Sequence, residues 1–212
     1  MNILSLITGI VTEGLIYSIM AYGIYISLKI LNFPDLSTDG TFPLGMACAV
    51  SCILKGINPF VSLLIAFALG MVFGAFTGFL LRAAGDNENL IITLAKNPGK
   101  VKITGLAFAN GLIATSGAIY LQYIKSFNVS AGTGSLVIGL AAVIIGTSIF
   151  GRMKFIKPTT GVVAGMIIYK AFISIAMLLG LQSKDTNLVV SVLFVAVMVF
   201  GNRKEISAGR AV

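Results

Sequence analysis

Charged residues inside long apolar stretches are the first candidates for chemistry in this sequence. Glu13 and Lys170 each lie within such a stretch. A charged side chain in hydrocarbon is costly unless it is paired or hydrated. Either residue could therefore border a water-filled pathway, the two could pair, or each could extend its charged end toward the membrane surface. The sequence leaves these three interpretations open.

One connection between two apolar segments is unusually polar: residues 31–45, with the sequence LNFPDLSTDGTFPLG. Pro34 and Pro43 are expected to interrupt helix. Thr38 or Asp39 can cap the short helix that follows by accepting hydrogen bonds from its free backbone N–H groups. A broken helix at membrane depth must be buried or line a cavity, and its positive N-terminal end would favour an anionic group of a substrate. The alternative is a plain cytoplasmic turn with a helix cap.

A second polar connection covers residues 81–100 and reads LRAAGDNENLIITLAKNPGK. From Arg82 to Leu94 the placement of polar residues at 86–89 and of apolar residues at 90, 91 and 94 predicts a short amphipathic helix, and the NPG sequence at 97–99 predicts a turn after it. A short helix between two membrane segments is suited to dock in the groove of a partner protein. It could equally rest at the lipid interface, and the residues alone do not decide between the two.

The sequence contains no motif for catalysis, metal binding or nucleotide binding. It has no histidine, no HExxH or GxSxG, and no GxxxxGK[ST] phosphate-binding loop. Cys48 and Cys52 fall on one helical face, but a zinc site needs about four ligands. We interpret the two cysteines as packing residues of a membrane helix, and we expect no metal, no cofactor and no enzymatic activity in this chain.

The elements that must position these residues are membrane helices. The 212-residue chain is 57% hydrophobic and 10% charged, with a mean hydropathy of +1.00, whereas soluble domains carry about 25% charged residues. Lipid must therefore solvate much of the surface. We predict an all-α, polytopic transmembrane helical bundle that forms a single membrane-embedded domain over residues 1–212. It has about seven hydrophobic segments, some of them short or broken, at residues 3–28, 40–54, 58–81, 103–124, 135–150, 159–182 and 187–201.

The basic residues lie in short clusters between the apolar runs. Clusters at residues 82–102, 151–158 and 203–210 fall on the same side of a seven-segment bundle, and the positive-inside rule makes that side cytoplasmic. The C-terminus is therefore predicted to be cytoplasmic. The net charge of +8 forms no basic stripe, so nucleic acid is not an expected partner.

Glycines recur four residues apart within two of the predicted helices. Gly70, Gly74 and Gly78 share one face of the third segment, and Gly161 and Gly165 repeat the spacing in the sixth. Small residues at this spacing let two helix backbones approach closely in lipid. The pattern predicts tight helix packing, with a moving interface as the alternative.

Several blocks of the chain resemble a known family. The N-terminal run, EGLIYSIMAYGIYISLKILNFPDLSTDGTFPLGMACAV, is similar to the opening of bacterial ABC-transporter permeases of the branched-chain amino acid and ribose importer superfamily. The blocks DLSTDGTF, LRAAGDNENLIITLAKN and SLVIGLAAVIIGTSIFG most resemble the subfamily paired with tryptophan- or tyrosine-type binding proteins. Together they cover most of the chain, and residues 82–88 are the most specific.

This resemblance implies roles for particular residues. Residues 82–97 would form the coupling helix that docks on a cytoplasmic ABC ATPase subunit, and the helices near 31–50 and 103–150 would line the translocation path of a permease homodimer. The implied coupling residues are Arg82, Gly85, Asp86, Asn87, Glu88 and Asn89. The candidate path residues are Glu13, Asp35, Ser37, Asp39, Thr41, Asn110 and Ser116, with Thr115 as a further polar candidate. An extracytoplasmic substrate-binding protein would deliver the solute.

One departure from the family pattern concerns the residues near 80. Members of the resembled family have two further membrane segments between the third helix and the coupling loop, whereas here GAFTGFL runs directly into LRAAGDNE. Loss of an even number of crossings preserves the orientation of the chain. It puts transport competence in doubt, because the core around the pathway would be incomplete.

We therefore expect the permease subunit of an ATP-driven importer of an amino acid, aromatic or branched-chain, or of a similar small solute. It would be a multi-pass protein of the bacterial plasma membrane, with ATP hydrolysis in a partner chain. One alternative is a secondary carrier or channel, for which only Glu13 and Lys170 could bind a coupling ion. The other is a membrane scaffold protein without a transport path.

Overall fold

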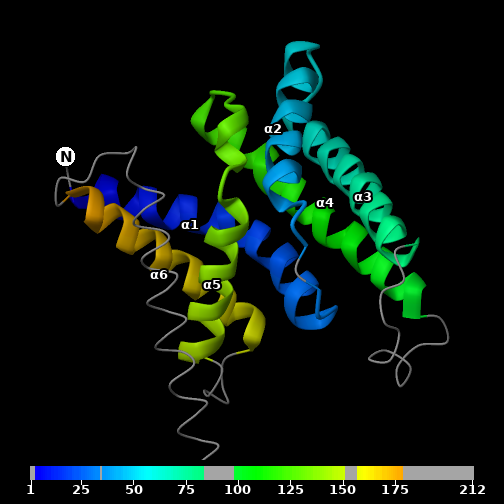
Figure 1. Ribbon diagram of the computed structural model, residues 1–212. Helices are drawn as coiled ribbons and strands as arrows, with labels where there is room; N and C mark the ends of the chain where they lie inside the picture. Colours follow the sequence, from blue (N-terminus) through cyan, green and yellow to red (C-terminus); the bar gives the residue numbers. More distant parts are fainter. Residues whose placement is uncertain (1–2, 34, 84–97, 151–156, 179–212) are drawn as a thin grey trace, which may run out of the picture. The chain divides into compact units, whose positions relative to one another are not determined.

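A computed structural model describes residues 3–33, 35–83, 98–150 and 157–178 of the chain (Figure 1). These residues form helices and turns, with no strand among them. The helices are α1 (Ile3–Tyr25), the π-helical turn η1 (Ile26–Ile30), α2 (Thr38–Leu54), α3 (Pro59–Ala83), α4 (Pro98–Ile124), the 3-10 turn η3 (Val129–Gly132), α5 (Ser135–Phe150) and α6 (Pro158–Leu178). The predicted all-α fold class is confirmed for this part of the chain.

Five described stretches are long and apolar enough to cross a membrane, namely Leu4–Ile30, Pro59–Leu80, Gly99–Ile124, Val129–Phe150 and Pro158–Leu178. The shorter apolar helix α2 completes the set. The fifth predicted segment is longer than expected, because η3 leads into α5 and the two form one stretch. The chain is thus a multi-pass helical membrane protein, and its seventh predicted segment, 187–201, lies outside the described residues.

Two prolines take positions that differ from the sequence prediction. Pro98 begins α4 where a turn was expected, because a residue in the first turn of a helix does not need the N–H that proline lacks. Pro43 lies inside α2 and does not end it. It leaves the carbonyl of Asp39 without the usual partner four residues on, and Gly132 of η3 packs directly against that carbonyl oxygen. The other predicted breaker, Pro34, lies outside the described residues.

The chain packs as two compact units. The first, Tyr22–Leu136, contains the end of α1 together with η1, α2, α3, α4 and η3, and we call it the α2–α4 unit. The second comprises Met1–Ala21 and Val137–Val212, and we call it the α1–α6 unit. Its described helices are most of α1, most of α5 and all of α6.

Glycines bring the helices of the α2–α4 unit close together. A Cβ atom added at Gly70 would lie 2.5 Å from the carbonyl oxygen of Asn110, and one added at Gly78 would lie 2.9 Å from the Cα atom of Ile103. These contacts run in opposite directions along the two helices, so α3 packs antiparallel to α4 (Figure 1). Close backbone approach supplies dispersion contacts where lipid provides no hydrophobic driving force. The packing role predicted for this glycine stripe is confirmed.

Glycines also bring the helices of the α1–α6 unit close together. Gly161 and Gly165 of α6 both pack against the backbone of Gly146 in α5. On α1, a Cβ atom added at Gly14 would lie 2.9 Å from the Cγ1 atom of Ile167. Helix α6 is therefore held by small residues against both α5 and α1.

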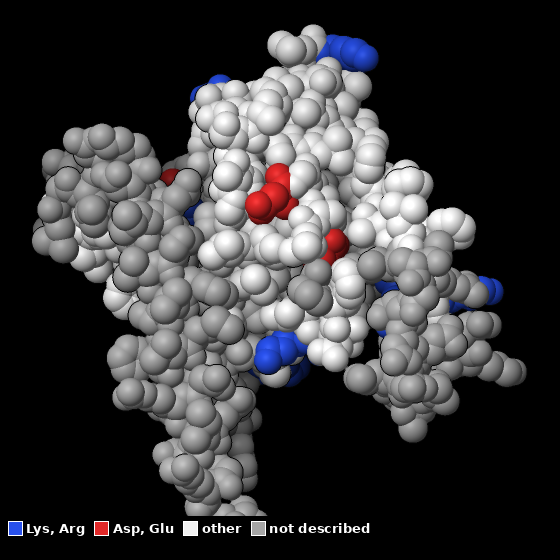
Figure 2. Space-filling model, viewed as in Figure 1, with Lys and Arg blue, Asp and Glu red and all other residues white. Residues whose placement is uncertain are grey.

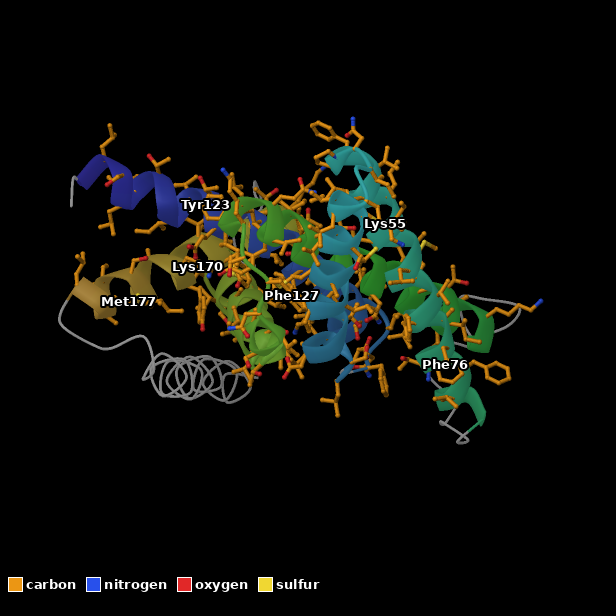
Figure 3. All side chains as sticks on the ribbon, turned by 90° about the horizontal axis from the view of Figure 1, so that it is seen from above. Lys55, Phe76, Tyr123, Phe127, Lys170 and Met177 are labelled. Carbon is orange, nitrogen blue, oxygen red and sulfur yellow. The ribbon has the colours of Figure 1, made fainter. Side chains whose placement is uncertain are left out.

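The outward surface of α3 is apolar. Phe60 and Phe76 are 79% and 60% exposed, and Phe76 points away from the helix (Figure 3). Most of the described surface in Figure 2 carries neither acidic nor basic side chains. Apolar surface of this extent is characteristic of membrane or protein contact, and in a multi-pass protein it is placed to meet lipid.

We expect Gly74→Ala to destabilise the packing of α3 on α4. The new methyl group would press against the carbonyl oxygen of Leu106 and lie 2.7 Å from the Cβ atom of Asn110, and overpacking of this kind costs about 1–3 kcal/mol. Gly40→Ala is the matched control, because nothing lies within 4 Å of its added methyl group. Thermal unfolding in detergent compares the two variants, and equal melting temperatures would contradict the close packing.

Candidate functional site

The connection between η1 and α2 folds back on itself, and one serine satisfies its backbone. The hydroxyl of Ser27 donates to the carbonyl oxygen of Phe33 (2.5 Å) and accepts from the N–H of Asp35 (3.2 Å). Its carbonyl oxygen accepts from the N–H of Phe33 (3.0 Å). Backbone polar groups at membrane depth must find partners within the protein. Ser27, which is 1% exposed, supplies them where the helix is broken.

Four of the predicted path residues meet at the start of α2: Asp35, Ser37, Thr41 and Asn110, here called the polar cluster. The amide nitrogen of Asn110 donates to Oδ2 of Asp35 (2.5 Å), and its Oδ1 accepts from the hydroxyl of Thr41 (2.7 Å). The other carboxylate oxygen of Asp35 accepts from the N–H (2.9 Å) and the hydroxyl (2.6 Å) of Ser37. The tertiary structure thus joins the broken helix to α4.

Uncharged donors satisfy the carboxylate of the polar cluster. Asp35 is 3% exposed, Thr41 4% and Asn110 0%, and the carboxylate of Asp35 accepts from the amide of Asn110 and from the hydroxyl and N–H of Ser37. The hydroxyl of Ser37 also lies 3.0 Å from Oδ1 of Asn110. Because a serine hydroxyl has one proton, Ser37 can donate fully to Asp35 or to Asn110 but not to both. The hydroxyl of Thr41 likewise lies within reach of two acceptors, Oδ1 of Asn110 and the carbonyl oxygen of Ser37 (3.0 Å). The cluster therefore contains hydrogen bonds that can change partner without movement of the helices.

The polar cluster lies near the middle of a membrane helix. Asn110 is close to the centre of α4 (Pro98–Ile124), about 18 Å from its start at 1.5 Å per residue. The hydrocarbon core of a bilayer is about 30 Å thick. The start of α2 therefore lies beside the middle of α4, next to Asn110, which favours the broken-helix interpretation of residues 31–45 over a plain cytoplasmic turn.

The side chain of Asp39 reaches another helix. Its carboxylate accepts hydrogen bonds from the N–H groups of Leu136 (2.8 Å) and Gly134 (3.2 Å) and from the hydroxyl of Ser135 (3.0 Å). It therefore satisfies backbone donors at the N-terminus of α5, where a negative charge also complements the helix dipole.

The predicted capping of α2 by Thr38 or Asp39 is wrong. The N-cap residue is Ser37, and its side chain makes no capping bond. Its backbone, at φ −72° and ψ −10°, is already helical, whereas a capping residue is usually extended. Thr38 instead donates to the carbonyl oxygen of Asp35 (3.1 Å), and Asp39 lies within the helix, two residues after the N-cap position.

Two other predicted path residues have their own surroundings. Glu13 belongs to the α1–α6 unit, where its Oε2 lies 3.0 Å from Nζ of Lys170. Of the three interpretations of these charged residues, the structure shows pairing. Ser116 is fully buried in α4, between Asn110 and the C-terminal end of that helix. The neighbouring Thr115 donates to the carbonyl oxygen of Gly111 within its own helix (2.8 Å).

The predicted coupling residues fall largely outside the described residues. The backbone of Arg82 continues α3, which extends to Ala83. Beyond that point lie the remaining five, Gly85, Asp86, Asn87, Glu88 and Asn89, together with the amphipathic helix predicted up to Leu94. Their assignment stays a prediction.

Sequence reasoning missed Ser27 and Gly132. Ser27 is a single small polar residue in an apolar run, and only its position shortly before a proline-containing polar connection could have drawn attention to it. Gly132 lies in the run SAGTGS, residues 130–135, whose small residues are typical of a turn. Its contact with the freed carbonyl of Asp39 could not be read from that run.

The described helices define the class of this protein: a multi-pass helical membrane protein with a buried polar cluster where one helix begins beside the middle of another. Residues 6–81 match the family described as branched-chain amino acid transport system / permease component. The chain is 30% identical over 269 residues to the tyrosine transport system permease protein of Clostridioides difficile (strain R20291), with 92% of this chain and 91% of that protein covered.

A second relative is an uncharacterized protein of Rickettsia prowazekii (strain Madrid E), 28% identical over 204 residues, with 90% of this chain and 67% of that protein covered. No solved structure matches the chain. From the identity and coverage of the Clostridioides difficile protein, this chain belongs to the family of permease components of branched-chain amino acid transport systems.

We expect Asn110→Ala to destabilise the α2–α4 unit, because it removes partners from Asp35, Ser37 and Thr41. A buried polar group left without a partner costs about 1–3 kcal/mol. Thr115→Ala is the matched control: it also removes a polar group from α4, but one that bonds only within its own turn in the contacts described. Thermal unfolding in detergent should show the larger loss for Asn110→Ala. Equal losses would mean that the polar cluster does not hold α2 to α4.

Proposed function

We propose that this chain is the transmembrane permease subunit of an ATP-driven importer of an amino acid, aromatic or branched-chain, or of a similar small solute. Cytoplasmic ABC ATPase subunits would hydrolyse ATP, and an extracytoplasmic binding protein would deliver the solute. A second copy of the chain would complete a homodimeric pathway in the bacterial plasma membrane. Membership of the permease family supports this assembly as a whole.

The observation that carries the proposal is the polar cluster at the start of α2. A solute that leaves water at mid-depth needs hydrogen-bonding groups in place of its hydration shell. The N-terminal end of a helix carries partial positive charge, and a helix that starts within the membrane can direct it at the carboxylate of an amino acid. Ser37 is the cluster member with partial exposure, so its hydroxyl is the group best placed to exchange partners with a solute.

The basic residues predict which side of the membrane would face the ATPase subunits. The clusters at 82–102, 151–158 and 203–210 place their loops and the C-terminus in the cytoplasm under the positive-inside rule. Residues 82–89 would then meet the ATPase subunits, and closure of those subunits on ATP would be passed to the helices on either side of the loop, α3 and α4. Since α4 carries Asn110, motion of α4 would act directly on the polar cluster.

The proposed absence of two family helices, near residue 80, accords in size with the length of the match to the Clostridioides difficile protein. That match spans 269 positions, whereas 92% of 212 residues is about 195, so about 74 positions have no counterpart in this chain. Two membrane helices of roughly 20 residues each, with their connections, would fit in such a gap. The polar cluster is built without them.

The rival interpretation as a secondary carrier needs a membrane residue that is free to bind a coupling ion. Glu13 and Lys170 were the candidates, and they bind each other at 3.0 Å. Because the two residues are paired, neither is free to bind a coupling ion. The pairing therefore favours ATP hydrolysis in a partner chain as the energy source for transport.

Charge reversal in the coupling segment should weaken attachment of the ATPase. We expect Arg82→Glu or Glu88→Lys to reduce co-purified ATPase about tenfold, because a like-charge contact replaces an attractive one, while membrane insertion stays intact. Lys55→Glu is the control, since it reverses an exposed lysine beyond the end of α2, on the side opposite the proposed ATPase. Unchanged ATPase recovery with both coupling variants would count against the role of this segment.

Water access separates a transport path from a scaffold. In a background without Cys48 and Cys52, single cysteines at Asp39, Asn110 and Ser116 should react with a small polar thiol reagent in intact membranes, the two buried positions more slowly than Asp39. A cysteine at Phe76, which faces away from the bundle (Figure 3), should stay unreactive because lipid surrounds it. A scaffold without a path would show no reaction at any of the three test positions.

A further inference from the structure

We propose that Glu13, Tyr17 and Lys170 form an intramembrane helix-pairing site, here called the charge lock, which fastens α6 to α1 and makes the lysine of α6 tolerable in lipid. This role is structural and does not depend on the proposed transport function. It removes Glu13 from the candidate path residues.

The three residues meet beside a close approach of α1 and α6. Gly14 leaves room for the backbone of Ile167, whose Cα atom would lie 3.2 Å from a Cβ atom at position 14. Lys170 stands about one turn beyond Ile167. It thus reaches the two residues that flank the close approach on α1, Glu13 and Tyr17, which are four apart and share one helical face.

The ammonium group of Lys170 has an attractive partner on either side. Its Nζ atom lies 3.0 Å from Oε2 of Glu13 and 3.7 Å from the centroid of the Tyr17 ring. The side chain of Lys170 is 12% exposed. In Figure 3, Lys170 lies on the side of α6 that faces α1. A carboxylate and an aromatic face together replace much of the hydration that the cation loses.

The depth of the charge lock explains why such pairing is needed. Lys170 lies about 18 Å from the start of α6 at Pro158, and Glu13 about 15 Å from the start of α1, at 1.5 Å per residue. Both charges are therefore near the middle of apolar helices that are long enough to span a membrane. A lone charge at that depth opposes insertion of its helix into the membrane. When two opposite charges are in contact, each compensates the other, and neither helix carries an uncompensated charge.

The pattern of single and double substitutions tests the charge lock. Lys170→Met or Glu13→Leu alone leaves one charge unpaired, and we expect each to lower the folded-to-unfolded ratio about tenfold or more. The double variant Glu13→Leu/Lys170→Met removes both charges, and we expect it to return to within about threefold of the wild type. Lys55→Met is the control for the loss of a lysine, because Lys55 is exposed at the end of α2. Thermal unfolding and the monodisperse fraction in detergent are the measurements.

Substitution of Tyr17 provides an independent test of the charge lock. Tyr17→Leu removes the ring beneath the ammonium, so it should destabilise the wild type more than it destabilises the Lys170→Met variant. Equal effects in the two backgrounds would overturn the part of the ring in the lock. A double variant no more stable than its weaker parent, or a Lys170→Met variant that behaves like Lys55→Met, would overturn the lock as a whole.

Uptake by the complete transporter separates pairing from a role in transport. If the wild type imports its solute, the folded double variant should import it as well. A double variant that folds but does not import would overturn the structural role and return the pair to the pathway. If the wild type itself does not import, the proposed function fails while the stability measurements still decide the charge lock.

Discussion

The hydrogen bond from the amide of Asn110 to the carboxylate of Asp35 is the contact on which the α2–α4 unit depends. A helix that begins within the membrane exposes backbone N–H groups, and here the carboxylate of Asp35, in a region with little water. Unless these groups are paired inside the protein, the break is too costly to keep. Asn110 offers donors and an acceptor from one side chain, so it can bind Asp35, Thr41 and Ser37 together. It thereby gives hydrogen-bond partners to buried polar groups that would otherwise destabilise the fold, and together these groups form the polar cluster.

Close helix packing is what brings Asn110 to that position. Gly70 and Gly74 of α3 lie directly against the backbone and Cβ atom of Asn110, and Gly45 of α2 packs against the backbone of Ala114 one turn further on. Helix α4 therefore packs closely against both α3 and α2 near Asn110. The glycines and the polar cluster are parts of one arrangement, since a hydrogen bond of 2.5 Å between Asn110 and Asp35 tolerates little displacement of either helix.

The carboxylates of Asp35, Glu13 and Asp39, all in the described helices and connections, are satisfied in three different ways. The carboxylate of Asp35 is held by neutral donors, one of which, Ser37, can change partner, and in the proposed function this exchange would let the site respond to a polar solute. The carboxylate of Glu13 is paired with the ammonium of Lys170, which also lies against the ring of Tyr17, an arrangement that satisfies the charges and leaves little to exchange. The first arrangement suits a pathway that changes during transport, and the second suits two helices that stay together. Asp39 represents a third use of a carboxylate, as the cap of a helix distant in sequence.

The membrane class, the approximate positions of the first six helices and the polar residues worth attention follow from the sequence, because hydropathy acts locally along the chain, whereas the early start of α4 at Pro98 does not. The partners of those residues do not, because each lies on another helix. Asp39 was expected to cap its own helix and caps α5, while Glu13 was grouped with Asp35 and is paired with Lys170. Ser27 stayed unnoticed because a lone serine in an apolar run carries no local signal. Pairing at a distance is decided by how the glycine-lined helices cross, which no stretch of sequence contains by itself.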